Sequence, residues 1–397
     1  MKLLSVTTTL SPGSAELIRM TGTVEKQSGE RFDIWFEVPI GLGDQLSNSG
    51  NPWLVAMLPY GMETGETIVC DIPSDAALVE NLNGVIATWC QWYPHLIAPK
   101  IEAPLSAFEL RHGTGDRTAG FFSGGVDSWF TVLRHLPELL PGAIGNLDEL
   151  ITVHGFDIPI ESVASFEQLR ETLANAAKKV GKEMVVVKTN LRRPGSLWAS
   201  AWGWLTNGAG LATVALLLEG KFGQVIIGSS YPYGNLGPWG SHPMVDPLFS
   251  TKHLSIKHDG ASFDRVEKTR LVASFEYALT SLHVCWKGQA QTNCGVCSKC
   301  VRTLATLELL QQNAPDNLFL EKFDPVRLRQ LFIATSQDEI FIKEIYVHSN
   351  ELGNHLIRDC AAQAIRRSTR LRRLFAVVDS VPVLWRIGPA LRRQFLH

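Results

Sequence analysis

The stretch Ser123-Gly124-Gly125-Val126-Asp127-Ser128 decides how this chain folds. Residues 118–122 before it predict a short strand, and residues 127–136 at its end follow a helical pattern. Glycines between a strand and a helix let backbone amides approach a ligand closely, and the start of a helix directs N–H groups and a positive dipole end at an anion. The stretch predicts a phosphate-binding loop, to which Ser123 and Ser128 add hydroxyl donors; the alternative is a Gly-Ser turn that happens to precede a helix.

Strands and helices alternate over residues 117–284. The predicted strands cover 150–153, 184–188 and 225–227, and the predicted helices cover 165–180 and 211–219. Such alternation favours an α/β domain with a mostly parallel sheet and helices on both faces. Ligands of these sheets lie beyond the carboxyl ends of the strands, which is where the phosphate-binding loop falls.

Residues 1–112 predict a separate N-terminal α+β module. Apolar and polar residues alternate over 31–38, which is typical of a half-buried strand, and the turn 27–30 would pair it with a strand at 21–26. The module would also contain a strand at 67–72 and a helix at 75–92. It contains no recognisable catalytic constellation, and the polar stretch 111–116 is typical of a linker.

The composition is that of an ordinary globular protein. The 397 residues carry a formal net charge of -2, with 45% hydrophobic and 19% charged residues, so no global field points to nucleic acid or to a membrane. The N-terminal apolar stretch is too short for a signal peptide, and no stretch reaches the roughly 18 apolar residues of a membrane span. We therefore expect a cytoplasmic protein with no transmembrane segment.

Four of the seven cysteines are clustered in a C-x8-C-x2-C-x2-C pattern, at Cys285, Cys294, Cys297 and Cys300. Thiolates at this spacing can turn onto one metal ion, and four of them complete a tetrahedral Zn²⁺ site. Because no ligand position is left for catalysis, we expect a closed, structural site in a helical subdomain at 285–345. An iron–sulfur cluster also uses four cysteines and stays open as an alternative.

The loop resembles the pyrophosphate loop of the ATP pyrophosphatase superfamily, whose signature is Ser-Gly-Gly-x-Asp-Ser. The spacing G-x-x-x-x-G-K-[ST] of the common nucleotide loop is missing from the chain. The resemblance implies an adenine nucleotide α-hydrolase-like fold and cleavage of ATP to AMP and pyrophosphate while an acceptor oxygen is adenylated. It implies that the six loop residues bind the nucleotide, with Asp127 beside the pyrophosphate, helping to place Mg²⁺, and Ser123 and Asp127 acting in catalysis.

The order of loop and cysteines is similar to 7-cyano-7-deazaguanine synthases, whose zinc site has the same spacing followed by a basic residue. This resemblance covers about residues 117–305 and makes Lys268 a candidate catalytic contact; the alternative is a solvated helix lysine. It also implies that His154, Gly155 and Phe156 cradle adenine through backbone contacts, with Gly228 at the nucleotide too. His154 could equally be a surface turn residue.

The chain departs from that family after the fourth predicted strand. The loop 228–243 is long and rich in aromatic residues, Gly and Pro, as substrate lids often are, and residues 246–265 look like additions. Four side chains near this loop are candidate substrate contacts: His242, Asp246, Lys252 and His253. We therefore expect a small-molecule carboxylate or amide as substrate, and a C–N bond-forming ligase that uses free ammonia or an amine, since no glutaminase site is recognisable.

Two other functions stay open. The acceptor could be tRNA or a protein, docked by the N-terminal module and by the basic helical tail 346–397, which carries nine Arg after Ile357. The alternative for the tail is a terminal helix packed on the domain with a solvated Arg face. The chain could also be a non-catalytic nucleotide sensor. The sequence does not fix the oligomeric state, and a homodimer is one of the options.

Overall fold

A computed structural model describes residues 1–106, 117–285 and 292–380. The predicted linker at 111–116 and the last part of the basic tail lie outside these residues. The described chain forms two compact units, and we describe each by itself. The first contains Met1–Ser123, Thr131–Ser230 and Pro238–Ala261, and the second contains Gly124–Phe130, Tyr231–Gly237 and Ser262–His397.

The first unit is built on a ten-stranded mixed sheet in the order β12-β11-β8-β9-β10-β3-β2-β1-β4-β6. The strands of this sheet are β1 (Lys2–Leu10), β2 (Leu17–Glu25), β3 (Arg31–Pro39), β4 (Ile68–Cys70), β6 (Ile101–Glu102), β8 (Thr118–Phe121), β9 (Glu149–His154), β10 (Glu183–Thr189), β11 (Gln224–Gly228) and β12 (Ser255–Asp259). A separate parallel pair joins β5 (Ser74–Asp75) to β7 (Leu105–Ser106).

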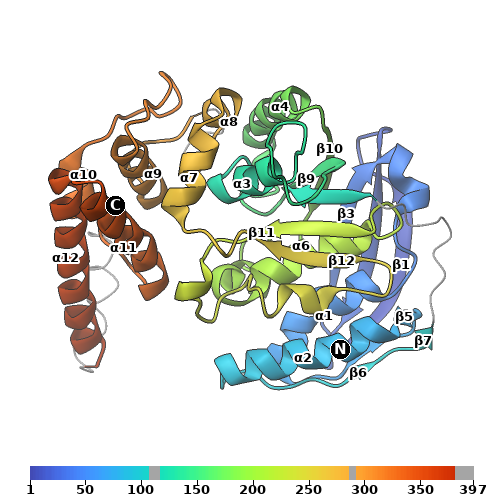
Figure 1. Cartoon of the computed structure of the whole chain (residues 1–397). Helices are drawn as coiled ribbons and strands as arrows, with labels where there is room; N and C mark the ends of the chain where they lie inside the picture. The colour runs from blue at the N-terminus through green and yellow to red at the C-terminus, as the bar shows by residue number, and fades with distance from the viewer. Residues whose placement is uncertain (107–116, 286–291, 381–397) are drawn as a thin grey trace. The chain divides into compact units, whose positions relative to one another are not determined.

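The core of this sheet is parallel, as the alternation of strands and helices predicts. Strands β12, β11, β8, β9 and β10 run parallel, and every residue of β8 is buried. Helix α4 lies on one face and helices α1 and α6 on the other, as Figure 1 shows. The helices of the first unit are α1 (Asn51–Thr64), α2 (Ala76–Trp92), α4 (Val163–Lys179), α5 (Leu197–Ser200) and α6 (Asn207–Leu217). The predicted fold class is confirmed: a mostly parallel core with helices and a helical C-terminal part.

The N-terminal strands extend this sheet. The predicted hairpin at 21–38 forms β2 and β3, with the turn closed by a hydrogen bond from Lys26 N to Glu30 O of 2.9 Å. Strand β3 then pairs antiparallel with β10, where Lys188 lies opposite Glu37. The antiparallel strands of this region share one sheet with the parallel strands. Whether residues 1–112 form a separate module stays a prediction.

Residues 246–265 add a further element to the sheet. They include the 3-10 turn Asp246–Phe249 and β12, which pairs parallel with β11 at the sheet edge. Ile256 is the only apolar residue of β12, and it is buried; the strand contacts a neighbour on one side alone. That single apolar position explains why the sequence does not predict the strand.

A buried carboxylate ties the N-terminal region to the α/β core. Glu219 follows α6, is 1% exposed, and accepts hydrogen bonds from Ser49 Oγ at 2.7 Å and Asn51 Nδ2 at 3.1 Å. The Ser47 hydroxyl donates to the same carboxylate at 2.5 Å. Burial raises the pKa of Glu219, and the three side chains that donate to it oppose that effect.

The second unit is helical. Its helices are α7 (Arg265–Ala273), α8 (Glu276–Thr280), α9 (Ser298–Leu309), α10 (Pro325–Gln330), α11 (Ser336–Glu351) and α12 (His355–Ser380), and α3 (Val126–Arg134) begins in it. Helix α12 buries Ile357, Cys360 and Ala364 against α10 and α11. The described part of the basic tail is therefore a packed helix. Among the described residues, no helix is both long and apolar enough to cross a bilayer.

Replacing Glu219 by Ala should lower the free energy of unfolding by about 3 kcal/mol, because buried donors on Ser47, Ser49 and Asn51 would lose their acceptor. Urea unfolding of the full chain measures this loss. Glu80→Ala, on the exposed side of α2, is the matched control and should change stability by less than about 0.5 kcal/mol. Equal effects of the two substitutions would contradict a stabilising role for Glu219.

Candidate functional site

The glycine loop enters the second unit in a conformation that only glycine adopts without strain. Gly124 has φ = 75°, and its carbonyl accepts a hydrogen bond of 2.8 Å from the His283 amide. The Ser128 hydroxyl donates to the Gly125 carbonyl at 3.0 Å. Helix α3 begins at Val126, so amides of its first turn lack intrahelical acceptors. Loop and helix start thus have the local geometry of an anion-binding turn.

Asp127, in the first turn of α3, contacts two cations of α7. Its Oδ2 accepts a hydrogen bond of 2.8 Å from Arg265 Nη2, and its Oδ1 lies 3.5 Å from Lys268 Nζ. The two cations are three residues apart, so they share one face of α7. The two cations of α7 thus share the one carboxylate of the glycine loop.

Lys268 is not a solvated helix lysine. Its side chain is 1% exposed, and its ammonium lies 5.8 Å from the centre of the Phe130 ring. Burial lowers the pKa of Lys268, and Asp127 opposes that effect. A buried ammonium is costly unless a negative group lies nearby, and the Asp127 carboxylate supplies one.

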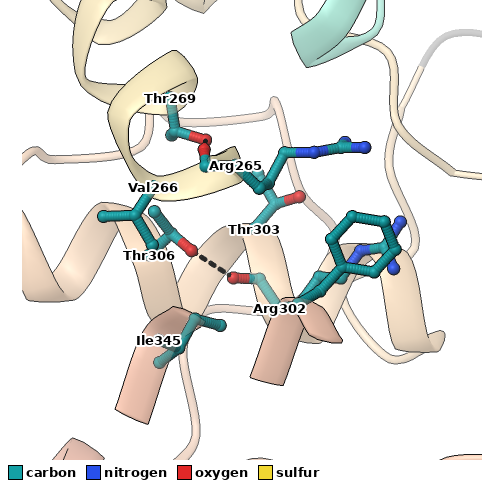
Figure 2. A pocket seen from close by; sticks show the side chains of 8 residues that line it. Arg265, Val266, Thr269, Arg302, Thr303, Thr306 and Ile345 are labelled. Atoms are coloured by element: carbon teal, nitrogen blue, oxygen red, sulfur yellow. Dashed lines mark hydrogen bonds between the residues drawn. The ribbon is translucent and has the colours of Figure 1, made fainter. Parts of the chain in front are cut away.

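A second arginine lies beside Arg265 against one aromatic ring, that of Phe341 on α11. The guanidinium carbons of Arg302 and Arg265 lie 4.0 and 4.9 Å from the Phe341 ring centre, and the ring of Tyr231 stacks on it at 5.0 Å. Burial and the charge of Arg265 lower the pKa of Arg302 to about 10. Arg265, Arg302 and Phe341 line the small pocket drawn in Figure 2. Its dashed line marks the hydrogen bond of 2.9 Å from Thr306 Oγ1 to the Arg302 carbonyl.

Glu344, one turn after Phe341, holds the start of α7. Its Oε2 accepts a hydrogen bond of 3.0 Å from the Arg265 amide, and among the described residues its buried Oε1 has no hydrogen-bond donor. Burial raises the pKa of Glu344 to about 7. The residue before Arg265, Asp264, caps α7 by accepting from the Glu267 amide at 2.8 Å. Both carboxylates fix the helix that carries Arg265 and Lys268.

The four cysteines of the C-x8-C-x2-C-x2-C pattern lie together, as their spacing predicts. Their Sγ atoms are all within 4.8 Å of one another, and the Cys285–Cys297 and Cys294–Cys300 pairs are each 3.9 Å apart. A tetrahedral zinc with Zn–S bonds of about 2.3 Å needs sulfurs about 3.8 Å apart. The cluster therefore fits a Zn²⁺ ion, and the iron–sulfur alternative stays open.

The polypeptide around the cysteines is built for close approach. Gly295 has φ = 73°, and a Cβ there would lie 2.6 Å from Glu321 atoms. The Cys297 amide donates to Cys294 Sγ at 3.3 Å, which favours a thiolate. The hydrogen bond from Cys300 lowers the pKa of Cys297 to about 4.

Asn293 joins the two halves of the cysteine motif. It is 1% exposed, and its Oδ1 accepts from the amides of Val284 and Cys285 at 2.8 and 3.0 Å. Its Nδ2 donates to the carbonyls of Leu282 and Leu318 at 2.9 and 3.0 Å. This side chain holds Cys285 next to the segment that carries the other three cysteines.

The predicted adenine contacts lie in the first unit, at the end of β9. His154 is not a surface turn residue: it is 1% exposed, its ring stacks on Phe166 at 4.1 Å, and burial lowers its pKa. Gly155 has φ = 107° and leaves no room for a Cβ, which would lie 2.0 Å from the Thr189 carbonyl. The Phe156 carbonyl accepts from Arg192, and Gly228 ends β11 opposite Asp259. His154 as a whole residue is buried, and the contact of these residues with adenine stays a prediction.

Two of the predicted substrate contacts lie in a buried polar cluster of the first unit. Asp246 is 0% exposed and accepts hydrogen bonds of 2.7 Å from His258 and 2.6 Å from Ser241. The ring of His242 packs edge-on against the ring of Trp92, with the ring centres 4.8 Å apart. Burial lowers the pKa of His242, and the nearby His258 lowers it further. Lys252 is exposed, and His253 is half-buried. The burial of His242 and Asp246 favours a structural role for both.

The structure brings two of the predicted site residues, Asp127 and Lys268, close together. Lys268 and loop residues 124–128, which include Asp127, belong to the second unit. Ser123 is exposed and is the last residue of the segment Met1–Ser123 of the first unit. Arg265 is a site residue that sequence reasoning missed, although its spacing from Lys268 was a usable signal. Arg302 was visible only as the basic residue after the last cysteine. Comparisons with family models, with curated proteins and with solved structures gave no match.

The cysteine cluster should bind one Zn²⁺ per chain, which metal analysis of the purified protein can measure. Cys300→Ser should abolish that stoichiometry and lower the melting temperature, because the metal closes the start of α9. Cys360→Ser changes a buried cysteine outside the cluster and should leave the zinc content unchanged. Iron and sulfide in the purified protein would contradict the zinc assignment.

Glu344 should make the protein less stable as pH rises from about 4.5 to about 7. Its pKa is near 4.5 in the unfolded chain and about 7 when folded, so folding favours the protonated form and that stabilisation is lost through this window. Urea unfolding of Glu344→Gln should show a difference from wild type that changes by about 3 kcal/mol between pH 4 and pH 8. The exposed Glu308→Gln on α9 is the control, and parallel curves for Glu344→Gln and wild type would refute the assignment.

Proposed function

We propose that this chain is a ligase of the ATP pyrophosphatase type, similar to 7-cyano-7-deazaguanine synthases. It would cleave ATP to AMP and pyrophosphate, adenylate a carboxylate or amide oxygen, and transfer nitrogen to the activated carbon. The observation that carries the proposal is the part of the loop in the second unit, residues 124–128, with a cationic face beside it, formed by Arg265 and Lys268 around Asp127.

The charges in the second unit suit a leaving pyrophosphate. The helix start of α3 and two cations against one carboxylate give a net positive environment where negative charge develops. Because Lys268 is buried, its attraction for phosphate oxygens is less screened by water than at a surface. These features support phosphate binding. That ATP is cleaved between its α- and β-phosphates is inferred from the resemblance of the loop to the ATP pyrophosphatase superfamily.

The reaction balances without a redox partner. An acceptor oxygen attacks the α-phosphorus, the bond to the β-phosphate oxygen breaks, and pyrophosphate leaves with the electron pair. A nitrogen nucleophile then attacks the activated carbon, loses a proton and releases AMP. Zinc at the closed Cys₄ site would support the fold and take no part in these steps.

Asp127 is the carboxylate of the loop that could help to place Mg²⁺. Magnesium keeps several waters and commonly takes one or two carboxylates together with phosphate oxygens, so one carboxylate is compatible with this role. In the structure Arg265 and Lys268 are its neighbours. On ligand binding, both cations would turn from Asp127 to the phosphates.

A small-molecule carboxylate or amide remains the proposed acceptor. The packing of α12 against α10 and α11 offers no argument for a docked tRNA or protein, so neither is carried further. The sensor alternative predicts nucleotide binding without turnover, and a measurement of product formation separates it from catalysis.

Wild-type protein incubated with ATP, Mg²⁺, ammonia and a pool of small carboxylic acids should form AMP and pyrophosphate in equal amounts. Asp127→Asn and Lys268→Ala should each lower that rate about 100-fold or more, because the first removes the carboxylate proposed to place Mg²⁺ and the second removes a cation next to the phosphates. The exposed Asp316→Asn is the matched control and should keep full activity. Formation of ADP and phosphate instead would exclude the proposed mechanism.

A further inference from the structure

Arg302 is a buried cation whose donors are poorly used. Its side chain is 10% exposed, and the nearest carboxylate oxygen, on Asp338, lies 4.0 Å away. Within the described residues no hydrogen bond from its guanidinium group is found. A guanidinium has five N–H donors in a planar fork, and buried polar groups normally have partners. The side chain therefore has unused capacity for an anion that offers two acceptor oxygens.

A second guanidinium lies beside it. Arg302 and Arg265 both contact the ring of Phe341, and Figure 2 shows their guanidinium groups extending to the same side, away from Val266 and Thr306. Two like charges against one ring repel each other. A phosphate group bound by both would remove that repulsion, since arginine forks match phosphate oxygens in bidentate geometry.

Arg302 lies on the same helix start as two residues of the cysteine cluster. Cys297 immediately precedes α9, Cys300 lies in its first turn, and Arg302 follows two residues later. At 3.6 residues per turn, positions two apart point to nearly opposite sides of a helix. The first turn of α9 thus carries a metal ligand on one side and a guanidinium on the other.

We propose that Arg302 binds a phosphate group of the nucleotide together with Arg265, and that the metal bound by the four cysteines sets its position. This inference rests on the proposed function and deepens it. The metal would then have a defined role, because it would hold the start of α9, and so an anion-binding side chain, at a fixed place in the second unit.

Titration calorimetry of pyrophosphate with Mg²⁺ into the zinc-loaded full chain tests this inference. Arg302→Lys keeps the charge but loses the fork, so pyrophosphate should bind at least tenfold more weakly, while zinc content and melting temperature stay as in wild type. Arg327→Lys changes a half-buried arginine that is paired with Glu321; it is the matched control and should bind as wild type. Unchanged affinity in Arg302→Lys would overturn the proposal. So would equal weakening in both variants.

A second arm tests the role of the metal. Chelating zinc from wild type should weaken pyrophosphate binding about as much as Arg302→Lys does, and chelation of Arg302→Lys should add little further. Additive losses would refute the dependence of Arg302 on the metal. Cobalt in place of zinc gives an independent readout, because Arg302→Lys should leave the Co²⁺–thiolate absorption unchanged; a changed spectrum would mean that Arg302 supports the metal site instead.

The outcomes separate this inference from the proposed function. If the wild type forms AMP and pyrophosphate and Arg302→Lys binds pyrophosphate normally, only the inference about Arg302 is contradicted. If pyrophosphate binding requires Arg302 but the wild type forms no AMP, the proposed function is contradicted and the anion-binding site is still supported. Wild type that does not bind pyrophosphate at all overturns both.

Discussion

The contact between Asp127 and the two cations of α7 is the interaction on which the rest of the site depends. A buried ammonium such as that of Lys268 is costly unless a negative group lies nearby, and Asp127 supplies that group at 3.5 Å. The same carboxylate binds Arg265 at 2.8 Å and so joins the glycine loop to α7. The loop and the cations come from sequence positions more than a hundred residues apart, and this contact brings them together in space.

Helix α7 is fixed at its start by several carboxylates. Asp264 caps it and accepts a hydrogen bond of 2.6 Å from His348, whose pKa this hydrogen bond raises. Glu344 holds the Arg265 amide from the side of α11. The cysteine cluster fixes α9 in a comparable way through Cys297 and Cys300. The second unit thus orients its basic side chains by fixing helix starts, where backbone donors and dipoles already favour anions.

Local patterns in the sequence predicted much of this structure. The alternation over 31–38 predicted β3, the glycine loop predicted the β8-to-α3 turn, and the cysteine spacing predicted the cluster. These features depend on neighbours in sequence, so a pattern can reveal them. The junction of β3 with β10 was not visible, because backbone pairing between residues some 150 positions apart leaves no periodic signal. Strand β12 was missed for a related reason: an edge strand buries few apolar residues.

The candidate site divides along the same line. For Asp127 and for the four cysteines between Cys285 and Cys300, motif and spacing in the sequence indicate the chemistry. Arg265 and Arg302 do not, because their significance lies in a shared contact with Phe341 on another helix. Conversely, Asp246 looked like a substrate contact, yet the structure buries it against His258 and Ser241. Burial of a polar side chain depends on the whole fold.

The most direct test is a crystal structure of the chain with Mg²⁺ and an ATP analogue that carries a methylene bridge between the α- and β-phosphates. The account predicts that the β- and γ-phosphates lie within hydrogen-bond distance of the Gly124 and Gly125 amides and of the Arg265 and Lys268 side chains. An analogue whose phosphates lie elsewhere, with Asp127 still bound to both cations, would contradict it.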